Sequence, residues 1–188
     1  MTIEIPETPA VRHPEYVYMD YARHLSGRLR RSITGPMYHG RSLREALEGC
    51  TAAEAVEKPL RTLPCIWDIV LHVAARAERA ILHMDGMVHE DPIPGDDWPR
   101  MPIPCTVEAW EASQRRMHEA YKALAVRVCQ VVSTGFVKVA ERSGCNVATM
   151  ADGIVEHGAY HAAQIVLIRK EVESRRIIRN AALTDQIW

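Results

Sequence analysis

Residues 149–175 read TMADGIVEHGAYHAAQIVLIRKEVESR, and this stretch predicts one long amphipathic helix. Apolar residues, interrupted by three polar ones, recur in steps of three and four, which is the spacing of a single helix face. The positions on that face are, in order, Met150, Ile154, His157, His161, Gln164, Ile168 and Val172. Three consecutive positions of a core-facing stripe are therefore polar. Because burying a polar group without a partner costs free energy, these side chains need partners inside the fold.

Three more stretches, residues 16–34, 64–86 and 106–131, show the same helical periodicity. Their inward positions are Tyr18, Ala22, Leu25, Leu29 and Ile33; Ile66, Ile69, Val70, Val73, Ala77, Ala80 and Ile81; and Val107, Trp110, Gln114, Met117, Tyr121, Leu124, Val128 and Val131. The pattern predicts an all-α protein with four long helices in a bundle. We expect one domain over residues 1–188, with a core of about 16–175, a flexible N-terminus at 1–15 and a C-terminal tail at 176–188.

Shorter elements are expected between the long helices. Ser42 with Glu45 and Thr51 with Glu54 have capping-box spacing, which predicts one or two short helices within residues 42–57. Five prolines within residues 86–105 predict a long extended connection, and such loops often lie over a functional site. Residues 136–140 fit either a short strand or a continued helix.

Composition and charge exclude several classes of protein. The chain carries 23 Lys and Arg against 24 Asp and Glu, so no basic excess favours a nucleic-acid partner. The N-terminus lacks the apolar core of a signal peptide, and no apolar run is long enough to span a bilayer. The five cysteines are scattered without a CxxC pair, at Cys50, Cys65, Cys105, Cys129 and Cys145. We therefore expect a cytoplasmic protein with reduced cysteines and no membrane partner.

Histidines supply the clearest chemical signal. His157 and His161 are four residues apart, so they lie on one helix face in a spacing that can chelate a divalent ion. His72, at the edge of the second apolar stripe, is the best candidate for a third ligand. Three imidazoles leave coordination positions open, which is typical of a catalytic site. The remaining helix and loop histidines are interpreted as surface or loop residues, namely His13, His24, His83, His89 and His118.

The motif differs from that of a zinc protease. Such a site would read HExxH, but position 158 is glycine, so no general base follows His157. Glu156 points about 100° away from His157 around the helix, as expected of a surface or supporting carboxylate. Gly153 and Gly158 would clear space for a substrate or let a neighbouring helix approach closely.

Residues 156–170, EHGAYHAAQIVLIRK, resemble the C-terminal signature of the DinB/YfiT-like family of metalloenzymes, approximately HxxYHxxQ. Residues 35–59, GPMYHGRSLREALEGCTAAEAVEKP, and 66–81, IWDIVLHVAARAERAI, resemble the first half of that family. The resemblance covers residues 20–172. It implies a four-helix bundle of mirror-type up-and-down topology, in which His72, His157 and His161 bind nickel, zinc or iron. It also implies a homodimer.

Other site candidates are weaker. Gln164 would orient a ligand or substrate, Tyr160 would gate the pocket, and His39, which resembles a family feature, is a candidate to reach it. The family often has a polar or glycine-containing segment before Trp67, whereas this chain has apolar residues around Cys65. Cys65 lies on the same helix face as His72, but we interpret it as a buried thiol.

Three functions are compatible with these residues. The first is a metal-dependent enzyme that activates a low-molecular-weight thiol or water. The family resemblance implies that it acts on a small-molecule substrate as a thiol-dependent S-transferase or isomerase, with hydrolysis as the second choice. The second is a non-catalytic, stress-related protein that binds a metal or small ligand. The third is a structural bundle with vestigial histidines. The missing HExxH glutamate favours a thiol over water, because hydrolysis usually needs a separate base.

Overall fold

The computed structural model describes residues 14–60, 62–87, 94–131 and 146–184, and its regular secondary structure there is entirely α-helical. The four long helices are α1 (Pro14–Thr34), α4 (Ile66–Met84), α6 (Val107–Cys129) and α7 (Val147–Thr184). Three short helices are α2 (Leu43–Leu47), α3 (Ala52–Ala55) and α5 (Pro94–Asp97). The all-α prediction is confirmed. The predictions for His13, His89, residues 136–140, Cys145 and residues 187–188 lie outside the described residues.

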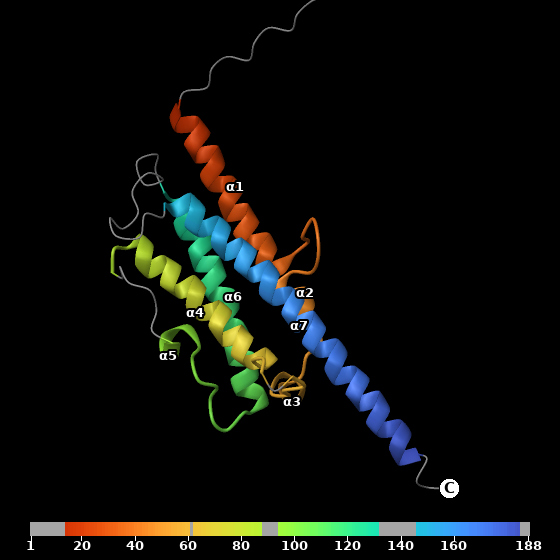
Figure 1. Cartoon of the computed structure of the whole chain (residues 1–188). Helices are drawn as coiled ribbons and strands as arrows, with labels where there is room; N and C mark the ends of the chain where they lie inside the picture. Colours follow the sequence, from red (N-terminus) through yellow and green to blue (C-terminus); the bar gives the residue numbers. More distant parts are fainter. Residues whose placement is uncertain (1–13, 61, 88–93, 132–145, 185–188) are drawn as a thin grey trace, which may run out of the picture.

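The long helices pack side by side, α1 and α4 each contacting both α6 and α7. Figure 1 shows α1 and α7 running in one direction and α4 and α6 in the other. Because α4 and α6 are parallel, the chain between them must return along the bundle to the end where it began. The proline-rich connection makes this return, and α5 within it packs against α4. No described helix is both long and apolar enough to cross a membrane.

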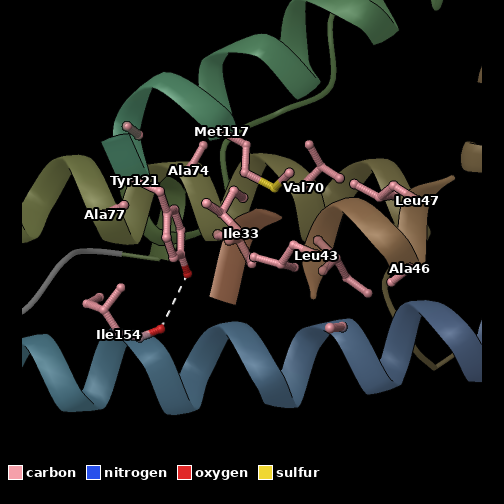
Figure 2. Close-up of a cluster of buried hydrophobic side chains, with 14 of the residues drawn as sticks. Ile33, Leu43, Ala46, Leu47, Val70, Ala74, Ala77, Met117, Tyr121 and Ile154 are labelled. Atoms are coloured by element: carbon pink, nitrogen blue, oxygen red, sulfur yellow. Dashed lines mark hydrogen bonds between the residues drawn. The ribbon is translucent and has the colours of Figure 1, made fainter. Parts of the chain in front are cut away.

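The buried core follows the predicted stripes. Leu25, Leu29, Ile69 and Val70 are fully buried, and Figure 2 shows part of this core between α2, α4, α6 and α7. One inward position was predicted wrongly, since Val107 is 57% exposed. It is the first residue of α6, at the end of the bundle.

Side-chain caps fix several helix ends, one of them at the predicted Ser42–Glu45 capping box. Thr106 Oγ1 accepts a hydrogen bond from Ala109 N (3.2 Å) at the start of α6. Ser42 and Glu45 form a complete capping box around α2. Gly35 has a φ of 75° after the last residue of α1, and a Cβ there would lie 2.6 Å from Glu45 Oε1. That conformation and the crowding both favour glycine.

Helix α7 is longer than predicted at both ends. It begins at Val147, two residues before the predicted start, and the Asn146 side chain accepts a hydrogen bond from Thr149 N there (2.8 Å). It continues to Thr184 instead of ending near Arg175, so residues 176–184 of the predicted C-terminal tail are helical. No glycine or proline interrupts this extension, and Arg175 Nε donates to Glu171 Oε1 (2.7 Å) along it. Residues 173–182 are exposed.

Candidate metal centre

Helices α4 and α7 bring three imidazoles together at their contact. His72 Nε2 lies 2.9 Å from His157 Nε2, which in turn lies 3.1 Å from His161 Nε2. One ligand atom from each residue lies within 4.8 Å of the other two. Within the described ranges, this histidine cluster is the group of side chains placed to hold a metal ion.

One of the two glycines in α7 allows a close helix contact. A Cβ at Gly158 would lie 3.0 Å from Tyr121 Oη and 3.5 Å from Leu43 Cδ1. Tyr121 on α6 donates to the backbone oxygen of Ile154 (3.3 Å), which ties α6 to α7 beside the histidines (Figure 2). Gly153 is exposed, and a Cβ there would meet nothing within 4 Å. The prediction of close approach therefore holds for Gly158 and not for Gly153.

Hydrogen bonds hold two of the rings in one orientation and one tautomer. The Nδ1 of His72 lies 2.6 Å from the backbone oxygen of Asp97, which can only accept, so His72 carries its hydrogen on Nδ1. The Nδ1 of His161 lies 2.7 Å from Gln164 Oε1, while Gln164 Nε2 donates to Tyr160 Oη (2.9 Å). The Nε2 atom of each of these two rings then carries a lone pair that faces His157, so it can accept a hydrogen bond or ligate a metal.

His157 cannot satisfy both neighbours. A hydrogen on its Nε2 can be donated to one of the two facing lone pairs, and the other is left without a partner. Its Nδ1 is buried and has no hydrogen-bond partner among the described residues. A cluster of three nitrogen atoms with too few hydrogens is a group that a cation would complete.

Burial keeps the imidazoles neutral at physiological pH. Removal from solvent, reinforced by the other two histidines, lowers the pKa of His157 from the usual 6.5 to about 3. Burial and the neighbouring His72 lower the pKa of His161 to about 4. The pKa of His72 is also lowered, chiefly by burial. A neutral imidazole is the form that ligates a metal.

The proline-rich connection supplies groups that the sequence patterns did not identify. Asp97, at the end of α5, accepts from His72 through its backbone and is held by Arg76, whose Nε lies 2.5 Å from Asp97 Oδ1. The indole of Trp98 stacks on the His72 ring, with ring centroids 3.9 Å apart and planes 3° apart. Two features of the sequence could have pointed to these residues. One is the run of prolines, which predicts a connection over a site, and the other is the position of Arg76 one turn after His72.

Of three residues considered near the site, His39 does not reach the cluster, while Glu156 and Cys65 lie as predicted. His39 is exposed, with its ring against Tyr38 at a centroid distance of 4.6 Å. Glu156 is exposed on α7. Cys65 is fully buried and caps α4 by accepting from Asp68 N (3.5 Å), and burial raises the pKa of its thiol to about 11.

Of the histidines interpreted as surface or loop residues, His24 is exposed. His83 and His118 are instead partly buried on helices.

The cluster fits a divalent transition-metal ion. Two nitrogens bound at about 2.1 Å to one ion, at angles of about 90° to 109°, lie about 3.0 to 3.4 Å apart. The two Nε2 separations from His157, 2.9 and 3.1 Å, are close to this range, and the ligand atoms of His72 and His161 lie within 4.8 Å of each other. The donors are neutral imidazole nitrogens, which suit zinc, nickel and iron.

The fold and the site define a class: α-helical bundle proteins with a three-histidine site between two long helices. Residues 38–165 match the family model of the DinB superfamily, and the chain belongs to this superfamily. The matched range contains all three histidines, Trp98 and Gln164, and it ends before the exposed extension of α7. Comparisons with curated proteins and with solved structures found no significant match.

Proposed function

We propose that this protein is a divalent-metal-dependent enzyme in which His72, His157 and His161 bind the ion. The observation that carries the proposal is the convergence of three Nε2 atoms that cannot satisfy one another by hydrogen bonding. A bound ion would acidify a coordinating thiol or water molecule. Nickel, zinc and iron are the candidate metals, because each accepts imidazole ligands.

The residues around the histidines have positioning roles in this proposal. The backbone oxygen of Asp97 and the side chain of Gln164 hold the Nδ1 hydrogens of two ligands, which keeps their Nε2 lone pairs turned inward. Trp98 forms an aromatic wall against His72. Tyr160 is 62% exposed and bonded to Gln164, so it is suited to gate entry of a small-molecule substrate.

A low-molecular-weight thiol is the favoured nucleophile. Hydrolysis would need a free base, and the nearby carboxylate of Asp97 is engaged by Arg76 on the Nδ1 side of His72. A thiol needs no such base, since coordination alone promotes its ionisation. We therefore propose transfer or isomerisation that uses a thiol co-substrate.

Elemental analysis of the untagged protein tests the metal site. We expect nearly one equivalent of nickel, zinc or iron in the wild type and a loss of that metal in His72→Ala and in His161→Ala. His39→Ala is the matched control, because that imidazole is exposed and lies outside the cluster. Retention of metal by both site variants would contradict the proposal, as would a wild type that takes up none of these ions.

Cobalt substitution tests the role of the thiol. Addition of a small thiol to the Co²⁺-loaded protein is expected to produce a thiolate-to-cobalt charge-transfer band, absent when the thiol is replaced by the corresponding alcohol. A protein that binds metal and never shows the band would be a metal-binding protein without thiol chemistry, which is the alternative function considered from the sequence.

A further inference from the structure

A small apolar pocket lies one helical turn from the histidine cluster. Its volume is about 100 Å³, and its walls come from the segment before α4, from α4 itself and from α7. The apolar walls include Leu60, Leu63, Ile69, Leu167 and Ile168. Among the described residues that line this pocket, Gln164 alone has a polar side chain.

Gln164 joins the pocket to the histidine cluster. The same side chain that lines the pocket accepts from His161 Nδ1 (2.7 Å). Leu167 follows His161 by six residues, which places it about 9 Å further along the axis of α7. Ile69 precedes His72 by one turn of α4. Because α4 and α7 run in opposite directions, both displacements point the same way along the bundle (Figure 1).

The pocket has a buried floor and an exposed rim. Ile69 and Ile168 are 0% and 3% exposed, whereas Leu60, Leu63 and Leu167 are 44%, 40% and 65% exposed. An apolar group placed here would remove leucine surface from water, which is favourable in proportion to the area covered. A cavity of about 150 Å³ accommodates benzene, so this smaller one suits a group of about four carbon atoms. It is too small to take a helix.

We propose that the pocket binds a short apolar group of the small molecule whose reactive end lies at the histidine cluster. This inference rests on the proposed function, because that function places a reactive group at the histidines. The ligand is then a molecule with a metal-seeking end, such as a thiol, and an alkyl substituent of about four carbon atoms about one helical turn away.

A series of straight-chain alkanethiols from two to eight carbons tests the inference. Binding is followed through the charge-transfer band of the Co²⁺-loaded protein. We expect affinity to rise by about fourfold per methylene over the part of the chain that enters the pocket, then to level off when it is full. Leu167→Asp is expected to remove most of this rise and to retain the affinity for the two-carbon thiol.

The matched control is Ile178→Asp, which places the same charge on the same helix at a residue 66% exposed and outside the pocket. It should retain the chain-length dependence of the wild type. An equal dependence in wild type and Leu167→Asp would overturn the inference and leave the metal site intact. Conversion of a wild-type dimer to a monomer by Leu167→Asp, seen by light scattering, would also overturn it, because a second copy would then cover the pocket.

A metal-free measurement separates this inference from the proposed function. Saturation-transfer NMR with butan-1-ol should give a signal in the wild type and Ile178→Asp that weakens in Leu167→Asp. If the protein binds no metal, the proposed function fails, and this signal still tests the pocket. Equal signals in all three proteins would show that the alcohol does not bind in this pocket and would overturn the inference.

Discussion

Two buried groups of polar atoms in this bundle differ in how completely their hydrogen bonds are satisfied. Between α4 and α6, Trp67 Nε1 donates to Ser113 Oγ (2.9 Å), and that hydroxyl donates to the backbone oxygen of Ala109 (2.8 Å). Trp110 Nε1 donates to the backbone oxygen of Cys50 (3.0 Å). Each donor in this tryptophan cluster therefore has an acceptor, as buried polar groups usually do.

The histidine cluster between α4 and α7 lacks this balance. His72 and His161 are oriented by good acceptors on their outer sides, while the three inner nitrogens face one another with too few hydrogens. A fully satisfied group stabilises the fold by itself. A group that is oriented but unsatisfied is suited to a ligand. The comparison therefore separates polar residues that serve stability from those that serve binding.

Acid should distinguish the two clusters most strongly. The folded-state pKa values of about 3 for His157 and about 4 for His161 lie below the usual 6.5. As pH falls below 6.5, the unfolded chain therefore binds protons that the folded chain excludes. We expect the free energy of unfolding of the metal-free protein to fall by several kcal/mol between pH 6.5 and 4. Above pH 6.5 the histidines should change it little. Urea denaturation across this range measures how steeply the free energy of unfolding depends on pH.

The matched variants sharpen that measurement. His157→Leu should reduce the dependence of the unfolding free energy on pH, because it removes the ring with the lowest pKa. Ser113→Ala should keep the wild-type slope, since the tryptophan cluster contains no group that titrates there. Identical slopes in wild type and His157→Leu would contradict the assignment of the acid sensitivity to the histidine cluster.

Removal of an indole should have unequal effects in the two clusters. Trp67→Ala is expected to lower the free energy of unfolding by about 3–5 kcal/mol, because the side chain is fully buried against Trp110. Trp98→Ala, whose indole is 38% exposed, should cost about 1 kcal/mol or less in the metal-free protein. Urea denaturation followed by circular dichroism compares them. Equal losses would show that Trp98 serves stability rather than the site.

The pair that fixes Asp97 should control metal affinity. Arg76→Ala frees Asp97, whose backbone oxygen orients His72, and we expect metal affinity to fall by about 10- to 100-fold. Arg116→Ala is the control, because its guanidinium pairs with Glu78 of α4 (2.8 Å) and contacts none of the histidines. Competition with a chromogenic chelator measures both. The same affinity loss in the two variants would refute a specific role for Arg76.

The two smallest effects on stability should differ in size. Ser113→Ala leaves Trp67 Nε1 without its acceptor and should cost about 1–3 kcal/mol. His157→Leu removes a ring whose Nδ1 is unsatisfied, but it also removes the hydrogen donated to one facing lone pair, so we expect the metal-free protein to change by only about 1 kcal/mol or less. Thermal unfolding with and without added Zn²⁺ measures both. The wild-type rise in melting temperature with Zn²⁺ should be lost in His157→Leu alone.

Errors in the sequence-based prediction have physical causes. Helix periodicity identified the inward faces because it is a local property, but Val107 shows that a stripe continues in sequence past the point where a neighbouring helix is available. The end of α7 was placed too early because the prediction relied on an apolar face. The extension to Thr184 is exposed over residues 173–182 and is supported by local ion pairs such as Arg175 with Glu171.

The amino-acid sequence alone determined that the protein is α-helical, where most of its core stripes and the caps at Ser42 and Thr51 lie, and that His157, His161 and Gln164 share one face of a helix. These properties depend on spacing within a single element. Only the tertiary structure decided that the Nε2 atoms of all three histidines meet, that Asp97 and Trp98 hold His72, and that leucines from distant segments form a pocket beside Gln164. Such contacts depend on the register between helices and the path of the connection, which packing of the whole chain sets.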